Sequence, residues 1–232
     1  MNDFNAKQLL ASIEHGLIVS CQAQSNSPLH NNQVIVAMAQ AAVNQGAVGV
    51  RIDTPSHVQA VRQQIGNFPI IGLWKQQIQG YEVYITPRYQ DAVAIAEAGA
   101  DIIAIDATLR PRPLQENLPD LVTKIQQQLG KLVMADVDSL ESASAAVAAG
   151  VDLIGTTLYG YTRQTLNYHP PGWQLLTQIV ATTNIPAICE GGVANPHMAQ
   201  KALELGAYAV VVGTAITGIE RKLQDFMAVF PD

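Results

Sequence analysis

The sequence feature that most constrains the fold is a join repeated four times along the chain. Each join closes an alanine-rich stretch with a glycine and then opens an apolar, largely β-branched run: NQGAVGVRI (44–52), EAGADIIAI (97–105), AAGVDLIGT (148–156) and ELGAYAVVV (204–212). A glycine just beyond a helix's last turn adopts the left-handed conformation at little cost. A solid apolar run suits a parallel strand covered on both faces. The pattern therefore predicts repeated helix-to-strand units.

Eight apolar runs of this kind can be counted, and each precedes a segment with helical periodicity. The expected strands are 16–22, 47–52, 69–74, 101–106, 132–137, 153–157, 186–191 and 209–213. Eight right-handed units in 232 residues close most economically as a (β/α)8 TIM barrel. The alternative is an open doubly wound sheet, but the first unit lacks the glycine fingerprint of a dinucleotide-binding fold. No linker divides the chain, so we expect one α/β domain spanning 1–232.

Composition narrows the class of protein and of partner. Hydrophobic residues make up 48% of the chain and charged residues 14%, with a net charge of -6, which favours a compact enzyme acting on small molecules over a nucleic-acid-binding chain. No apolar run is long enough to cross a membrane and no secretory leader is visible, so we expect a cytoplasmic protein that does not bind membranes. Cys21 and Cys189 fall inside apolar runs and are expected to be reduced. No histidine ends a predicted strand, which argues against a metal site.

The active site of a closed barrel forms where the strands leave its carboxyl face. Polar residues gather at these predicted ends, namely Gln22, Arg51, Lys75, Asp106, Asp136, Thr156, Thr157 and Glu190. Lys75 follows Ile71, Leu73 and Trp74, so we expect its amine to be partly desolvated and to act as a base. Glu190 would favour the ammonium, and the two groups would titrate together. The alternative is a rim salt bridge without chemistry.

Three other strand ends carry charges with competing interpretations. Arg51 offers a planar fork to an oxyanion or phosphate, or else forms a packing salt bridge with Asp53. For Asp106 we expect a structural role as acceptor of hydrogen bonds from loop amides. Asp136 is expected to face a sugar hydroxyl.

Glycines follow the seventh and eighth predicted strands, in EGGVANP (190–196) and VGTAITG (212–218). Barrels commonly bind phosphate at this place with backbone amides and a helix amino terminus. Ordinary turn glycines are the alternative. The segment LYGYT (158–162) is either a pocket-closing loop or an aromatic turn.

Seven motifs in order along the chain resemble one enzyme family: GLIVSCQA, PIIGLWK, VYITPRYQDAVAIAEAGADIIAIDATLRPRP, MADVDSLE, IGTTLYGYT, ICEGGVANP and LGAYAVVVGTAIT. They are similar to the N-acylglucosamine-6-phosphate 2-epimerases, also called N-acetylmannosamine-6-phosphate epimerases. The resemblance runs from about residue 16 to residue 217.

This resemblance implies a TIM barrel that interconverts N-acetylmannosamine 6-phosphate and N-acetylglucosamine 6-phosphate by proton abstraction and return at C2, without a cofactor. Lys75 matches the base and Glu190 its acid/base partner. Gln22, Arg51 and Asp136 match substrate-binding positions, and we add Thr157 to that group. The partner it implies is a phosphorylated N-acyl amino sugar.

The chain departs from the family at two positions linked to binding. The family usually carries arginine where Gly192 and Gly218 stand here, and the second of these is associated with phosphate. We therefore expect phosphate to be held by Gly192 and by the amides of Gly213 and Thr214, or by Arg221. Gln76 also replaces a family arginine next to Lys75.

Two other functions remain open on the sequence. One is another phosphosugar isomerase or lyase on the same barrel, since glycines after the last two strands are common to them all. The other is a phosphosugar-binding barrel that has lost its activity. A homodimer is expected only because barrels of this size often form one.

Overall fold

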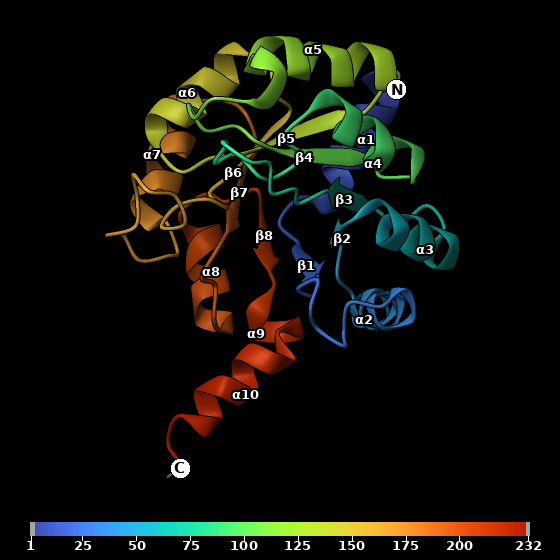
Figure 1. Ribbon diagram of the computed structural model, residues 1–232. Coiled ribbons are helices and arrows are strands. Elements are labelled where there is room, and N and C mark those ends of the chain that lie inside the picture. Colours follow the sequence, from blue (N-terminus) through green and yellow to red (C-terminus); the bar gives the residue numbers. More distant parts are fainter. Residues whose placement is uncertain (1–2, 231–232) are drawn as a thin grey trace.

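The structure, a computed structural model, describes residues 3–230 and contains a closed barrel of parallel strands. The strands follow one another around the barrel in chain order, and β8 pairs with β1 to close it (Figure 1). This confirms the predicted (β/α)8 barrel and excludes the open sheet. The strands are β1 (Leu17–Cys21), β2 (Gly49–Asp53), β3 (Ile70–Leu73), β4 (Ile102–Asp106), β5 (Leu132–Asp136), β6 (Leu153–Gly155), β7 (Ala187–Glu190) and β8 (Ala209–Val212).

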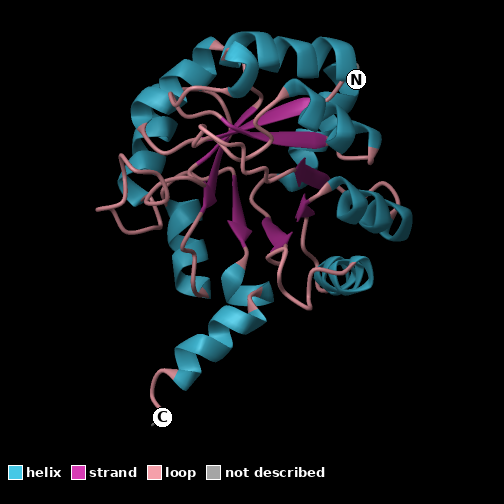
Figure 2. Ribbon diagram, in the orientation of Figure 1, coloured by secondary structure: helices cyan, strands magenta, loops and turns pink. Residues whose placement is uncertain are grey.

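Helices surround the barrel on its outside (Figure 2). They are α1 (Asp3–Ile13), α2 (Asn32–Asn44), α3 (Pro55–Ile65), α4 (Tyr89–Glu97), α5 (Leu118–Leu129), α6 (Leu140–Ala148), α7 (Trp173–Thr182), α8 (Pro196–Glu204), α9 (Thr214–Thr217) and α10 (Ile219–Met227), with a 3-10 turn at Pro113–Gln115. No helix within residues 3–230 combines the length and apolar character that crossing a bilayer requires.

The four predicted helix-to-strand joins are all present. Gly46, Gly99, Gly150 and Gly206 have φ values of 85°, 104°, 80° and 91°. These values lie in or beside the left-handed region, which residues other than glycine rarely adopt. Each glycine therefore ends one helix and directs the chain into the next strand, as the sequence predicts.

The apolar core has two layers. One fills the space between the strands and the outer helices. The other fills the inside of the barrel and includes Ile18, Ile71, Met134 and Ile188. Ile13 of α1 belongs to this inner layer, and three further side chains of the helix, Ala6, Leu9 and Leu10, pack against it. Because α1 precedes β1, it covers the amino-terminal end of the barrel and leaves the carboxyl end open for a site.

The last helix has an unusual position. Figure 1 shows α10 leading away from the barrel, and it buries none of its residues. Apolar side chains recur on it and just beyond it with helical spacing. Those more than half exposed are Ile219, Leu223, Phe226, Met227, Val229 and Phe230.

Candidate active site

A buried arginine lies at the centre of the barrel mouth. Arg51 of β2 donates from Nη1 and Nη2 to Asp136 Oδ1 and Oδ2 at 3.2 and 2.5 Å. Nη1 also lies 3.0 Å from Oε2 of Glu190. The side chains are 1% exposed for Arg51, 0% for Asp136 and 12% for Glu190. We call these three residues, together with Thr157, the ion cluster.

Two expectations for Arg51 need correction. The ladder with β3 pairs Asp53 with Leu73, so β2 ends at Asp53 rather than at Arg51. Asp53 Oδ1 accepts the backbone N–H of Lys75 at 2.9 Å, and Arg51 bonds to other acids instead. Because Arg51 is buried and both of its terminal nitrogens are already bonded, it does not present an open fork to a phosphate.

Asp136 is also buried beneath the mouth. The Thr157 hydroxyl lies 2.6 Å from Asp136 Oδ1 and 3.2 Å from Glu190 Oε2, so its single proton is shared between two acids. Both oxygens of Asp136 thus bond to protein donors. Asp136 orients Arg51 in this structure, and its contact with a sugar hydroxyl stays a prediction.

Glu190 is the group of the ion cluster whose charge is most easily changed. Its pKa is raised from 4.5 to about 7, chiefly by burial and also by Asp136, while Arg51, Thr157 and Lys75 oppose the rise. For Arg51, burial alone would lower the pKa, but Asp136 and Glu190 raise it above the usual value. The arginine therefore stays charged, whereas Glu190 can gain or lose a proton near neutral pH.

Lys75 stands at the rim, next to Gln22. Its Nζ donates to Gln22 Oε1 at 2.6 Å, so two predicted site residues, one after β1 and one after β3, meet. Lys75 also lies close enough to Glu190 to lower the pKa of that carboxyl. The expected desolvation of Lys75 is wrong, because the residue is exposed rather than enclosed by its apolar neighbours.

Asp106 has the structural role predicted for it. Its Oδ1 accepts hydrogen bonds from the N–H and the hydroxyl of Thr108 at 3.1 and 2.7 Å. Its Oδ2 pairs with Arg110 Nη2 at 2.7 Å. These contacts fasten the loop after β4 at the edge of the mouth.

The sequence reasoning missed a segment that enters the barrel wall. After β3 the chain turns back, and residues 84–86 lie between the ends of β3 and β4. Gln76 N–H donates to the Tyr84 carbonyl at 2.9 Å, and Thr86 N–H donates to the Trp74 carbonyl at 2.8 Å. On the other side, Asp106 N–H donates to the Ile85 carbonyl at 2.8 Å. This insertion brings the side chain of Tyr84 to the mouth, and no local sequence pattern announces such a pairing.

The loop after β6 covers part of the mouth. Burial raises the pKa of Tyr161, and the nearby Glu190 raises it further. A Cβ placed on Gly191 would lie 3.4 Å from Cε2 of Tyr161. Arg163 also pairs with Glu82 of the loop after β3 at 3.0 Å. These contacts favour the pocket-closing interpretation of LYGYT over a simple aromatic turn.

The glycines after β7 and β8 lie in tight surroundings. Gly192 has a φ of 70°, and a Cβ there would meet Pro170 Cβ at 2.6 Å. A Cβ on Gly218 would meet the backbone of Thr214 at 2.8 Å. In this packing neither position has room for a side chain.

The expectation for Arg221 needs revision. Its Nε pairs with Asp225 Oδ1 at 3.1 Å, and its side chain is 68% exposed. It lies on α10, which leads away from the barrel (Figure 1). Within this chain Arg221 is therefore committed to a surface ion pair and does not face the mouth.

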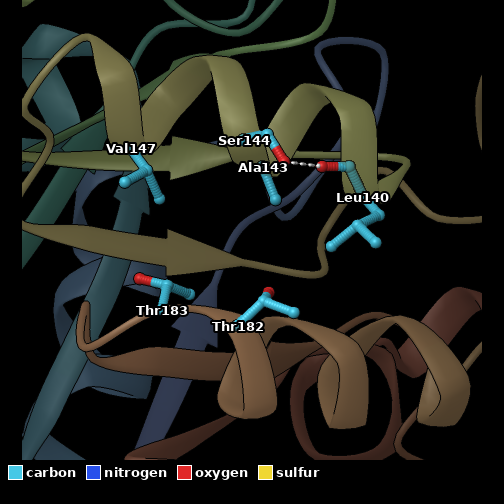
Figure 3. A pocket seen from close by; sticks show the side chains of 6 residues that line it. All are labelled: Leu140, Ala143, Ser144, Val147, Thr182 and Thr183. Carbon is cyan, nitrogen blue, oxygen red and sulfur yellow. Dashed lines mark hydrogen bonds between the residues drawn. The ribbon is translucent and has the colours of Figure 1, made fainter.

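A small cleft between α6 and α7 lies apart from these residues (Figure 3). Its volume is about 150 Å³, and it is lined by Leu140, Ala143, Ser144, Val147, Thr182 and Thr183. Ser144 donates its hydroxyl hydrogen to the Leu140 carbonyl at 2.9 Å. None of these side chains is charged at neutral pH, so the cleft offers no acid or base for the chemistry described above.

Comparison with known proteins places this arrangement in a family. The family described as "Putative N-acetylmannosamine-6-phosphate epimerase" matches residues 35–230. A protein of Thermosynechococcus vestitus described as "Putative N-acetylmannosamine-6-phosphate 2-epimerase" is 61% identical over 220 residues, covering 95% of each chain. A Synechococcus elongatus protein with the same description is 55% identical over 222 residues, covering 95% of this chain and 96% of its own.

Solved structures agree in fold. The N-acetylmannosamine-6-phosphate 2-epimerase from Clostridium perfringens superposes with a TM-score of 0.91 at 37% identity, covering 96% of each chain. A thiamine phosphate pyrophosphorylase from Pyrococcus furiosus superposes with a TM-score of 0.62 at 19% identity, covering 90% of each chain, and shares the fold alone.

The buried pairing of Arg51 predicts a large loss of stability when Asp136 is removed. In Asp136→Ala the guanidinium loses its bidentate partner, so the free energy of unfolding in urea should fall by about 3–5 kcal/mol. The control is Asp225→Ala, which breaks the exposed pair with Arg221 and should cost under about 0.5 kcal/mol. Equal small losses in the two variants would contradict a structural role for the ion cluster.

The raised pKa of Glu190 predicts a pH dependence of stability. Folding favours the protonated carboxyl, because its pKa rises from 4.5 to about 7. This contribution is complete below pH 4.5 and is lost as the pH rises through about 7. Glu190→Gln has no carboxyl to titrate there, so wild type should lose stability relative to this variant over that range. Urea unfolding at a series of pH values measures the difference, and a constant difference would contradict the shift.

Proposed function

Because this chain belongs to the N-acetylmannosamine-6-phosphate epimerase family, we propose that it interconverts N-acetylmannosamine 6-phosphate and N-acetylglucosamine 6-phosphate at C2 without a cofactor. The structural observation that best supports the proposal is that Lys75 and Glu190 lie at one barrel mouth, with Lys75 close enough to lower the pKa of Glu190. One is a rim amine held by Gln22, and the other is a carboxyl with a pKa near 7. A carbon acid can exchange its proton between two such groups.

The chemistry requires the open-chain sugar. With C1 as an aldehyde, the hydrogen on C2 becomes acidic because the electron pair left behind moves to the oxygen of C1. In this proposal Lys75 takes that proton, and a proton then returns to the opposite face of C2. Either Lys75 alone serves both faces, or Glu190 supplies the second proton, for which a pKa near 7 suits it.

The other members of the ion cluster act through Glu190. Arg51 and Thr157 both contact Oε2 of that carboxyl, and Asp136 holds both of them in place. We therefore assign Arg51, Asp136 and Thr157 to positioning Glu190 beneath the substrate. Gln22, which bonds to Nζ of Lys75, positions the amine.

For the phosphate we propose backbone amides rather than an arginine. The N–H groups of Gly192 and Gly213 donate to no acceptor within residues 3–230, and both follow strands that end at the mouth. Together with Thr214 they form a set of neutral donors suited to an oxyanion. The close packing around Gly192 and Gly218 excludes a cationic side chain at both of these positions.

We also propose that the protein is a homodimer, with α10 in the interface. An apolar stripe that includes Leu223 and Phe226, 59% and 69% exposed, is unfavourable in water and is typical of an interaction surface. The same helix carries the exposed ion pair of Arg221 and Asp225.

The dimer proposal predicts the effect of charging this stripe. Leu223→Asp combined with Phe226→Asp should convert a dimer into a monomer, measured by sedimentation velocity. Asp225→Ala on the same helix should leave the dimer intact. A monomeric wild type, or a double variant that remains dimeric, would overturn the proposal.

The epimerase proposal predicts exchange of the C2 hydrogen with solvent. Wild type incubated with either epimer in deuterated water should introduce deuterium at C2. Lys75→Ala should slow this labelling by at least about 100-fold, because it removes the base. The control is Lys201→Ala, since Lys201 lies over the ring of Trp173 on the outer helices and should have no effect. Proton NMR follows both label and epimer.

Each outcome has a separate meaning. Absence of label with wild type would overturn the epimerase proposal itself. Label that persists in Lys75→Ala would overturn only the role of Lys75. With C2-deuterated substrate in ordinary water, deuterium retained in the product would favour a single base, whereas complete loss would favour a second group such as Glu190.

A further inference from the structure

Tyr84 reaches the mouth from the inserted segment. Its backbone is fixed on both sides, by Gln76 N–H on its carbonyl and by Asp106 Oδ2, which accepts the Tyr84 N–H at 3.3 Å. The neighbouring pair of Lys75 and Ile85 forms an isolated antiparallel bridge. Tyr84 and Lys75 therefore extend from adjacent, hydrogen-bonded stretches of backbone.

The side chain of Tyr84 combines a packed ring with an unused hydroxyl. The ring packs against the apolar layer inside the barrel. The hydroxyl makes no hydrogen bond within residues 3–230, and it is not among the polar atoms that are both buried and unpartnered. Water or a ligand can therefore reach it, while its ring is held by the core.

The charges around Tyr84 place it beside the ion cluster. The pKa of Tyr84 is raised to about 12, chiefly by burial and also by Asp136 and Asp106, while Arg110 and Arg51 oppose the rise. Its ring packs against the inner layer of the barrel, where the charges of Asp136 and Arg51 are close enough to change its pKa. A phenol with this pKa stays protonated at neutral pH and remains a hydrogen-bond donor.

The proposed reaction needs a hydrogen-bond donor to the oxygen of C1, and no residue assigned so far provides one. Negative charge develops on the oxygen of C1 as C2 loses its proton, and a fixed donor there lowers the barrier. Arg51 and Thr157 already give their hydrogens to carboxylates. Lys75 is engaged as the base. Two unused donors remain among these neighbours, the Nε–H of Arg51 and the hydroxyl of Tyr84. Arg51 Nε is buried, so only the Tyr84 hydroxyl is open to a ligand.

We propose that Tyr84 is a catalytic residue of this chain, whose phenol donates a hydrogen bond to the C1 oxygen as that oxygen gains charge. This inference rests on the proposed epimerase function and deepens it. No bond to Tyr84 forms or breaks. The proton of C2 goes to the base, the electron pair moves to the C1 oxygen, and the phenol keeps its proton throughout.

The test removes a single oxygen atom. Tyr84→Phe should lower kcat by about 100- to 1000-fold with little change in KM, because the hydrogen bond is strongest in the transition state. Deuterium incorporation at C2 from solvent should fall by the same factor, since deprotonation itself is slowed. The unfolding midpoint should stay at the wild-type value.

The matched control is Tyr89→Phe. Its phenol bonds to Gln128 Oε1 at 2.9 Å between two outer helices, and its loss should leave kcat unchanged. A Tyr84→Phe variant with normal kcat, or with only a raised KM, would overturn the inference while wild-type labelling upheld the epimerase. A fall in kcat matched by a lowered unfolding midpoint would also overturn it, since the effect would then be structural.

Discussion

The bidentate contact between Arg51 and Asp136 is the interaction on which the rest of the site depends. A guanidinium buried inside a barrel is costly unless acids compensate its charge, and here Asp136 does so almost completely shielded from water. With that charge balanced, Glu190 is left as the acid whose protonation can change. Burial is the largest cause of the rise in the pKa of Glu190 to about 7; Asp136 adds to the rise and Arg51 opposes it.

The parallel strands of the barrel bring the charged residues of the site together. Parallel strands all end at the same face, so β5 and β7 bring Asp136 and Glu190 to the same end of the barrel. Arg51 sits two residues before the end of β2, and its long side chain reaches both acids. The paired charges of Arg51 and Asp136 are buried beneath the mouth, and Lys75 is exposed at its rim.

Periodic and local features could be predicted from the sequence, whereas pairings across the barrel could not. Gly46 and the three matching glycines predict the helix-to-strand joins, because each join needs a positive φ at one residue and glycine adopts it readily. Tyr84 enters the wall through hydrogen bonds to residues near β3 and β4, which no window of sequence shows. The exposure of Lys75 escaped prediction for a similar reason, because the chain turns back at the rim and does not enclose the amine. The sequence indicates a functional role for Arg51 but not its partners, which lie 85 and 139 positions away along the chain (51 to 136 and 51 to 190).

The helix α1, which covers the amino-terminal end of the barrel, limits where substrate can enter and product can leave. The interior is filled by side chains and the amino-terminal end is covered, so substrate enters and product leaves at the carboxyl face. Two epimers of equal size must then use the same passage in turn, so each excludes the other while bound. Accumulated product therefore slows turnover in either direction, because it competes with substrate for the one opening.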